Sequence, residues 1–264
     1  MALYSRGELE ETNRVIREFC RNQPCFIRLN FMTDNGDRGF YANSFSKGVL
    51  GYIHLMMQNG ICLGDRQLTF LSYSNSQLKS HSCWFLCRDD VNHAVHEESI
   101  ENFMGDFSKE KNVLKKYARR GQCFSTSKRV CELNPDQVEF RLDDIERNGY
   151  CFTDGVGYIS PKLAREAAEY FKYSQVSAFQ IRLAGAKGVL MVKPELEGRC
   201  IQLRKSQIKF DSRDLSFNVI RCSTFSVGFF NRSLVLLLTC LGVPDHYFLR
   251  KQRLAKQLVD ANEI

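Results

Sequence analysis

The sequence predicts an α+β fold in which a compact core of strands lies between helical flanks. Three observations predict this class. Short segments alternate apolar and polar residues as strands do, other segments repeat apolar residues at helical spacing, and turn-forming residues separate the two kinds. The chain has 264 residues, of which 44% are hydrophobic and 25% charged, so it is long enough for one large or two modest globular domains.

Expected helices and strands follow one another in the first half of the chain. We expect helices over residues 8–19, 45–59, 99–107 and 109–120, and strands over residues 25–32, 67–72 and 83–86. Gly60 is placed to end the second helix, and Asp34-Asn35-Gly36-Asp37 is a strong turn signal after the first strand. The acidic segment over residues 136–148 is expected to be a surface connection.

The second half opens with a turn over residues 153–157 and then returns to regular structure. Ser160 and Pro161 suit the cap and the first position of a helix, which we expect to run to about residue 172. Residues 187–192 are almost continuously apolar after their lysine, as in a strand buried on both faces, and another strand is expected over residues 217–221. Helices are expected over residues 231–241 and from residue 244 onward. The apolar run 234–243 is too short to span a bilayer, so it predicts a buried helix.

One short signature, an amide and a cation around an apolar residue, occurs three times. The three copies are Gln180-Ile181-Arg182, Gln202-Leu203-Arg204 and Gln207-Ile208-Lys209. In a strand each copy would place the amide and the cation on one face and the apolar residue on the other. Between the first two copies, glycines flank Lys187, so a ligand or another backbone could approach it closely. Such a face suits a phosphate chain, but the solvated face of an ordinary antiparallel sheet has the same pattern, and the spacing leaves both interpretations open.

The charges of the chain are unevenly distributed. The net charge is +7 and the pI about 8.8, which is below the range typical of a dedicated nucleic-acid-binding domain. Residues 109–129 nevertheless hold eight cations and one acid, and residues 132–146 are acidic. The basic block suits a polyanion or an acidic partner surface, and a solvated helix face is the alternative.

The cysteines point to free thiols in a reducing compartment. Eleven cysteines make an odd number at irregular spacing, and the polar N-terminus lacks the apolar region of a signal peptide. Cys83 and Cys87, followed by His93 and His96, are spaced too closely for the usual zinc pattern, and the cysteines lie in an apolar run. We therefore expect core cysteines and an intracellular protein, in the nucleus or the cytoplasm, with no membrane partner.

Several short motifs follow one another along most of the chain. They are Asn13-Arg14-Val15-Ile16-Arg17, Ser76-Gln77-Leu78, Ser82-Cys83-Trp84-Phe85, Met104-Gly105-Asp106-Phe107-Ser108, Gly121-Gln122-Cys123-Phe124-Ser125, Phe152-Thr153-Asp154-Gly155-Val156-Gly157, Gln180-Ile181-Arg182, Gly185-Ala186-Lys187-Gly188, Leu203-Arg204, Lys209-Phe210, Asn231-Arg232 and Leu241-Gly242-Val243. In this order they resemble the cellular, RNA-silencing type of RNA-dependent RNA polymerase, from about residue 13 to residue 248.

The resemblance implies a fold and a chemistry. Enzymes of this type build their active site between two double-psi β-barrels, of which the first supplies lysines and the second a metal-binding Asp-x-Asp-Gly-Asp loop. It implies an upstream helical and β neck over residues 1–148, the first double-psi barrel over residues 149–222, and a helical segment over residues 223–264 that leads toward the second barrel.

The resemblance also implies roles for single residues. Lys187 and Lys209 match the two active-site lysines of the family, which would stabilise charge on the phosphates during nucleotidyl transfer. Arg182 and Arg204 are expected to bind the RNA backbone, and Asp154 to shape a turn. The cofactor would be Mg²⁺ bound by carboxylates outside this chain. The expected partners are an RNA template, nucleoside triphosphates and the second-barrel region, in cis or in trans.

The sequence also departs from the family. Ala184 stands where many members have glycine, Lys205 where many have proline and Ser233 where many have glutamine, and no Asp-x-Asp-Gly-Asp motif occurs in the sequence. We therefore expect a fragment of an RNA-directed RNA polymerase that makes double-stranded RNA for silencing, and expect it to be inactive alone. The alternatives are a non-catalytic RNA-binding or interaction module derived from such a polymerase, and an α+β domain without a retained function.

Overall fold

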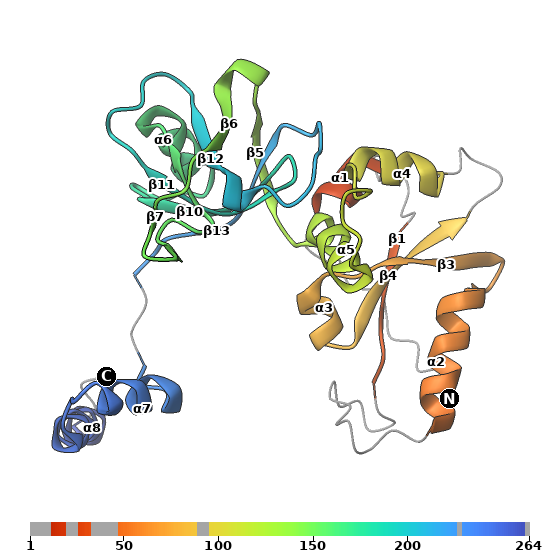
Figure 1. Ribbon diagram of the computed structural model, residues 1–264. Helices are drawn as coiled ribbons and strands as arrows, with labels where there is room; N and C mark the ends of the chain where they lie inside the picture. Colours follow the sequence, from red (N-terminus) through yellow and green to blue (C-terminus); the bar gives the residue numbers. More distant parts are fainter. Residues whose placement is uncertain (1–11, 20–25, 33–46, 89–94, 226–228, 262–264) are drawn as a thin grey trace. The chain divides into compact units, whose positions relative to one another are not determined.

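The computed structural model describes residues 12–19, 26–32, 47–88, 95–225 and 229–261 of the chain. The chain divides into two compact units, Met1–Ser223 and Thr224–Ile264, which are described separately. Helices and strands are mixed in the first unit, which confirms the predicted α+β class (Figure 1). The expected turn at residues 34–37, and the first residues of the helices expected from residues 8 and 45, lie outside the described residues.

A four-stranded antiparallel sheet, in the order β1-β4-β3-β2, forms the first part of this unit. Its elements are α1 Arg14–Phe19, β1 Phe26–Asn30, α2 Lys47–Asn59, β2 Ile61–Leu63, β3 Arg66–Ser72, α3 Asn75–Lys79, β4 Ser82–Arg88, α4 Glu97–Met104, α5 Val113–Arg120 and the short 3-10 helix η1 Gly121–Phe124. The helices and strands expected here are confirmed, with ends that differ by a few residues. Side chains of α1, α4, η1 and the sheet enclose Trp84, the single tryptophan of the chain.

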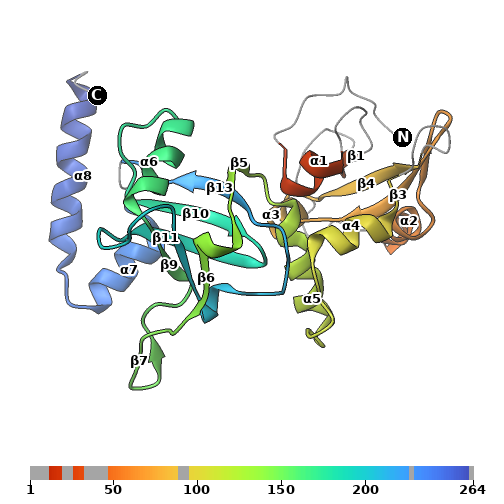
Figure 2. The same cartoon turned by 90° about the horizontal axis from the view of Figure 1, so that it is seen from above.

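Seven strands form a second, mixed sheet in the order β5-β13-β10-β11-β9-β12-β6. Its elements are β5 Lys128–Glu132, η2 Pro135–Gln137, β6 Val138–Leu142, β9 Val156–Ile159, α6 Pro161–Tyr170, β10 Ala178–Leu183, β11 Ala186–Val192, β12 Ile201–Arg204, η3 Lys205–Gln207 and β13 Ser216–Cys222, and a small hairpin pairs β7 Glu146–Arg147 with β8 Tyr150–Cys151. The pairs β11–β9 and β12–β6 are parallel and the others antiparallel. Figures 1 and 2 show this sheet curled into a half-barrel. Its double-psi connectivity stays a prediction.

Helix α6 covers one face of the curled sheet. As predicted, Ser160 caps it: its hydroxyl oxygen accepts a hydrogen bond from the Leu163 amide at 3.5 Å, and Pro161 occupies the first turn. Leu163 lies in one buried cluster with Ile181 and Leu190 of the central strands. Because side chains alternate along a strand, Gln180 and Arg182 of β10 lie on the opposite face, as the first triplet predicted.

Three expectations from the sequence are wrong. Strand β11 is not buried on both faces, because Val189 and Met191 are 36% and 47% exposed and only the alternate residues face the α6 side. The segment 136–148 is more than a surface connection, because it contains β6, which pairs in parallel with β12. The third triplet is not a strand, because Gln207 ends the 3-10 helix η3 and its side chain is fully buried.

The division predicted between residues 148 and 149 stays a prediction. Strands β5 and β6 precede that position and pair with β13 and β12, so the seven-stranded sheet draws on both sides of it. The basic block over residues 109–129 includes α5, which has no buried residue; both a solvated helix face and a surface for a polyanion or an acidic partner agree with this exposure.

The second unit consists of two consecutive helices, α7 Arg232–Cys240 and α8 Asp245–Asp260. Asn231 caps α7 by accepting a hydrogen bond from the Leu234 amide at 2.8 Å, and Gly242, with φ of 93°, allows the turn. The prediction that the helix in this segment is buried is wrong, because α7 has no buried residue and Leu236 and Leu237 are more than half exposed. Among the helices that the structure describes, none is both long and apolar enough to cross a membrane.

Candidate phosphate-binding site

The β10–β11 hairpin places two cations face to face. Arg182 of β10 is the register partner of Lys187 of β11, and both project from the face opposite to α6. Like charges directly opposite each other in an antiparallel pair are destabilising. The hairpin turns through Ala184, whose φ of 46° is uncommon for a residue other than glycine, so the departure from the family at this position has a small conformational cost.

The segment after η3 brings Lys209 to the same hairpin. Ala186 forms an isolated antiparallel bridge with Ile208, and the Lys209 amide donates a hydrogen bond to the Gly185 carbonyl at 3.0 Å. A Cβ on Gly185 would lie 1.7 Å from the Phe210 carbonyl oxygen, so only glycine permits this approach. The glycine-flanked lysine therefore serves the close approach of another backbone, one of the two interpretations that the sequence left open.

Gly188, on the other side of Lys187, serves the same purpose. Its φ is 155°, and a Cβ there would lie 2.1 Å from the Gly155 carbonyl oxygen. That carbonyl accepts a hydrogen bond from the Val189 amide at 2.9 Å. The turn that contains Asp154 is thereby held against β11, and Asp154 itself is an exposed turn residue, as expected.

Electrostatics distinguish these three residues, which we call the cation cluster: Arg182, Lys187 and Lys209. Partial loss of hydration lowers the pKa of the Lys187 ammonium, and the positive charges of Arg182 and Lys209 lower it further. Burial lowers the pKa of Arg182 to about 10, which leaves its guanidinium charged at neutral pH. Within the part of the chain that the structure describes, no carboxylate forms an ion pair with any of the three.

The hydrogen bonds of the cluster also leave donors free. Arg182 donates from Nη1 to the Ile181 carbonyl at 2.9 Å and from Nη2 to the Ser125 hydroxyl at 3.4 Å, while its buried Nε has no partner. Lys209 donates to the Ser206 carbonyl. A buried guanidinium N–H without a partner is costly.

A network around Asp144 holds the segment that carries Lys209. The Asp144 carboxylate accepts hydrogen bonds from the Ser206 amide at 3.0 Å, the Ser206 hydroxyl at 2.7 Å and the Thr153 hydroxyl at 3.0 Å. The Ser206 hydroxyl oxygen in turn accepts from the Gly155 amide at 3.0 Å. Sequence reasoning missed Asp144, because its partner Ser206 lies 62 residues further along the chain and its acidic segment has the composition of a surface loop.

Arg204 lies outside the cation cluster. It is 4% exposed, and its guanidinium donates to the carbonyls of Val156 and Asp143 and to the Tyr158 hydroxyl. It also lies over the Tyr158 ring, with its Cζ atom 5.2 Å from the ring centroid. All three of its guanidinium nitrogens are thus used within the protein. Its expected contact with RNA stays a prediction, and this geometry favours a structural role.

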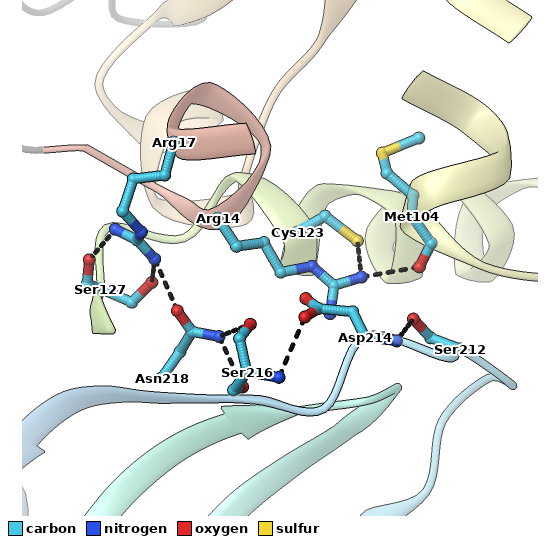
Figure 3. A network of polar contacts seen from close by, with 9 residues as sticks. All are labelled: Arg14, Arg17, Met104, Cys123, Ser127, Ser212, Asp214, Ser216 and Asn218. Carbon is cyan, nitrogen blue, oxygen red and sulfur yellow. Dashed lines mark hydrogen bonds and ion pairs between the residues drawn. The ribbon is translucent and has the colours of Figure 1, made fainter. Parts of the chain in front are cut away.

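A buried polar network holds the connection between η3 and β13 against helix α1. This network was not predicted from the sequence. Arg14 of α1 forms an ion pair with Asp214, 3.4 Å between Nη1 and Oδ2, and donates from Nη2 to the Met104 carbonyl at 2.6 Å (Figure 3). Arg17, one turn later, donates to Asn218 of β13 at 2.6 Å and to Ser127. The motif around residue 14 therefore positions the segment that contains Lys209 and Phe210.

No metal site is found in the described part of the chain. Among those residues, no group of three histidine, cysteine or acidic side chains could hold an ion. Cys83 and Cys87 are buried free thiols, as expected, and burial raises the pKa of Cys83 to about 12, whereas His93 lies outside the described residues. The described histidine, cysteine and acidic side chains therefore do not fit a catalytic metal ion.

Comparison with known proteins agrees with this arrangement. A family model described as "RNA dependent RNA polymerase" matches residues 1–263. The chain is 34% identical to a rice protein named "Probable RNA-dependent RNA polymerase SHL2", over 93% of this chain and 21% of that protein. It is 38% identical to "RNA-dependent RNA polymerase 1" of Schizosaccharomyces pombe, over 97% of this chain and 21% of that protein. The chain thus spans about a fifth of the length of these relatives.

A solved structure shares the fold. "RNA dependent RNA polymerase QDE-1 from Thielavia terrestris" superposes with a TM-score of 0.64 at 19% sequence identity, over 81% of this chain and 25% of that chain. The family model covers almost the whole sequence, and the two relatives match 93% and 97% of it. The chain belongs to the RNA-dependent RNA polymerase family.

Proposed function

We propose that this chain is part of an RNA-directed RNA polymerase that makes double-stranded RNA for silencing, and that its cation cluster binds phosphate groups of RNA or of the incoming nucleotide. The observation that carries the proposal is the pairing of Arg182 with Lys187, two like charges that face each other without a neutralising carboxylate among the described residues. A polyanion resolves that repulsion.

The chemistry of nucleotidyl transfer explains what such cations do. Negative charge builds on the phosphoryl oxygens and on the leaving pyrophosphate, and preplaced donors stabilise it by about 3 kcal/mol each. Lysine suits this role because its ammonium is a compact charge on a flexible stem. Two Mg²⁺ ions clamp the attacking and leaving oxygens in reactions of this kind. We propose that carboxylates outside this chain hold them.

The proposal extends to architecture, partners and location. Residues 149–222 would form the first double-psi barrel, residues 1–148 the neck, and residues 223–264 a segment leading toward the second barrel. RNA template, nucleoside triphosphates and that second-barrel region would be the partners. Free thiols, several of them buried, favour an intracellular location, in the nucleus or the cytoplasm.

RNA binding by the 264-residue chain tests the proposal. Fluorescence anisotropy of a labelled 12-nucleotide RNA would be measured from low to moderate salt for the wild type, Lys187→Ala and Lys209→Ala. Each variant should lose roughly tenfold in affinity, and the slope of log affinity against log salt should fall by about 0.7.

The matched control is Lys162→Ala. Lys162 is an exposed cation on α6, which covers the opposite face of the sheet. This variant removes the same charge and should retain the wild-type affinity and slope. Equal binding by all four proteins would overturn the assignment of the cluster.

The alternative function is a non-catalytic RNA-binding module. It rests on the same cations and differs in needing no metal. Because the isolated chain is expected to be inactive under both hypotheses, primer extension in the presence of Mg²⁺ is measured with the chain and the second-barrel region together. RNA synthesis that requires both would support the polymerase fragment and exclude the non-catalytic module, whereas synthesis by the isolated chain would contradict the expectation that it is inactive alone.

A further inference from the structure

Lys187 is the lysine of the cation cluster whose amine has no partner. It is exposed, and among the residues that the structure describes its ammonium nitrogen forms no hydrogen bond and no ion pair. Two lysines of the neighbouring segment are engaged instead. Lys209 donates to the Ser206 carbonyl, and Lys205 forms an ion pair with Asp143 at 2.6 Å. The Lys187 amine is therefore open to react with a reagent from solution.

The backbone fixes two positive charges beside this amine. In the antiparallel pair of β10 and β11, Arg182 is the register partner of Lys187. The Cβ atoms of such partners lie about 5 Å apart. The Lys209 amide donates to the Gly185 carbonyl at 3.0 Å, which ties the third member of the cluster to the turn of the same hairpin. The proximity of the three charges therefore follows from strand register and from a close backbone contact.

These charges favour the neutral, nucleophilic form of the amine. Partial loss of hydration lowers the pKa of Lys187, and the charges of Arg182 and Lys209 lower it further. Asp154, the acid in the turn that packs against β11, forms no ion pair among the described residues that would oppose them. Lysines that lose hydration or lie beside another cation serve as nucleophiles in enzymes. Lys187 should therefore react faster than a fully hydrated lysine.

The same charges favour an anionic reagent over a neutral one. Arg182 keeps its charge at neutral pH and, within the part of the chain that is described, pairs with no carboxylate. Positive charges without counter-ions raise the local concentration of anions. A reagent that carries phosphate groups is therefore concentrated beside Lys187, whereas an uncharged reagent is not.

We propose that Lys187 is an acylation site that reacts with acyl thioesters whose thiol carrier bears phosphate groups. The neutral Nζ attacks the carbonyl carbon of the thioester, a C–N bond forms and the C–S bond breaks. The sulfur leaves as a thiolate, and the proton that the nitrogen loses neutralises it. The product is a neutral amide, and the step needs no oxidant or reductant.

Acylation would act on the fold and on the cluster in opposite directions. It removes one of the two like charges that face each other across β10 and β11, so the folded chain should become more stable. It also removes a cation from the cluster, so the cluster should bind phosphate groups more weakly. This second effect rests on the proposed function, whereas the reactivity of Lys187 does not.

The experiment compares two acetyl donors on the full chain at pH 8. One is acetyl-coenzyme A, which carries phosphate groups, and the other is the acetyl thioester of N-acetylcysteamine, which carries none. Mass spectrometry of peptides measures the rate of acetylation at each lysine. With acetyl-coenzyme A, Lys187 should react roughly tenfold faster than Lys162, the exposed lysine of α6. The ratio of the two rates should be smaller with the uncharged thioester.

Two variants test whether the cluster causes this reactivity. Lys209→Ala removes a neighbouring charge and should slow the reaction of acetyl-coenzyme A at Lys187 roughly threefold or more. The matched control, Lys162→Ala, removes an exposed cation on the other face of the sheet and should leave that rate unchanged. Fluorescence of Trp84 during urea unfolding checks that both variants are folded as the wild type is.

The effect on stability is measured with two further variants. Lys187→Gln is neutral, as an acetylated lysine is, and Lys187→Arg keeps the charge. Lys187→Gln should unfold at the higher urea concentration, because it alone removes the repulsion from Arg182. A midpoint equal to or below that of Lys187→Arg would contradict the predicted gain in stability.

The outcomes separate this inference from the proposed function. Equal rates at Lys187 and Lys162 with acetyl-coenzyme A would overturn the acylation site, and so would a fast rate that Lys209→Ala leaves intact. An equal preference for Lys187 with both thioesters would exclude the phosphate-bearing donor. If Lys187 is acetylated selectively and the acetylated chain binds RNA as the wild type does, the acylation site stands and the proposed function of the cluster fails.

Discussion

Removing one partner of the buried Arg14–Asp214 ion pair should lower the free energy of unfolding of the first unit strongly, because the remaining charge stays buried without its partner. The two side chains are 5% and 6% exposed, and the atoms Nη1 and Oδ2 are 3.4 Å apart. A buried charge that has lost its partner typically destabilises a protein by about 3–5 kcal/mol. We expect a loss of this size for Asp214→Asn, in which the Arg14 charge remains. Removal of both charges costs less than the sum, because no isolated charge is left behind.

A double-mutant cycle measures this difference. Urea unfolding would be followed for the wild type, Arg14→Met, Asp214→Asn and the double variant by the fluorescence of Trp84, which lies in the same buried cluster as Phe210. With an m value of up to about 3 kcal/mol/M, each single change should lower the midpoint by about 1 M or more.

The double variant should be more stable than additivity predicts by at least about 1 kcal/mol. Asparagine retains an oxygen that can accept the hydrogen bond from the Ser216 amide, which limits the loss at Asp214 to its charge. Additive losses, each below about 1 kcal/mol, would refute the argument, because they would mean that water reaches both groups.

Three further predictions concern the cluster. Asp144→Asn should weaken RNA binding nearly as much as Lys209→Ala, and the double variant should lose little more, because Asp144 acts through the segment that carries Lys209; anisotropy measures this. Loss of hydration alone would raise the pKa of Asp144, but hydrogen bonds from Ser206 lower this pKa overall in the folded chain. The Asp144 carboxylate therefore stabilises the folded chain fully above about pH 4, and this stabilisation is lost as the pH falls through the lowered pKa of the folded state. Urea unfolding at pH 5 and pH 3 should show that the stabilities of Asp144→Asn and the wild type converge at the lower pH. Lys187 has a lowered pKa, so an amine-reactive acyl reagent at pH 8 should modify it faster than Lys162, and bound RNA should protect it in mass spectrometry.

The first triplet was predictable because its pattern is local. In β10 the alternation of Gln180, Ile181 and Arg182 matches the alternation of exposed and buried faces, and this depends only on strand geometry. The helix that begins after Ser160 was predictable for the same reason, since a cap and a first-turn proline act within four residues.

The prediction for the third triplet was wrong because contacts of the Gln207 side chain, one of them 18 residues away in the chain, determine its conformation. Gln207 accepts a hydrogen bond from the Arg204 amide at 3.0 Å and donates to the Val189 carbonyl at 3.2 Å, so its side chain turns inward and closes a 3-10 turn. Nothing in the spacing of the triplet distinguishes that arrangement from a strand. The same limit applies to Asp144 and Ser206, which are 62 residues apart in the chain.

The cation cluster combines both kinds of information. The strand pattern alone places Arg182 and Lys187 on one face, which an ordinary solvated sheet would also do. The packing of Gly185 against the Phe210 backbone brings Lys209 to the same hairpin, and partial loss of hydration together with the charges of Arg182 and Lys209 lowers the pKa of Lys187. Such an arrangement lowers the stability of the folded chain, since cross-strand like charges cost up to about 1 kcal/mol and the buried Arg182 Nε has no partner. An anion bound at the cluster, as we propose, would offset this cost.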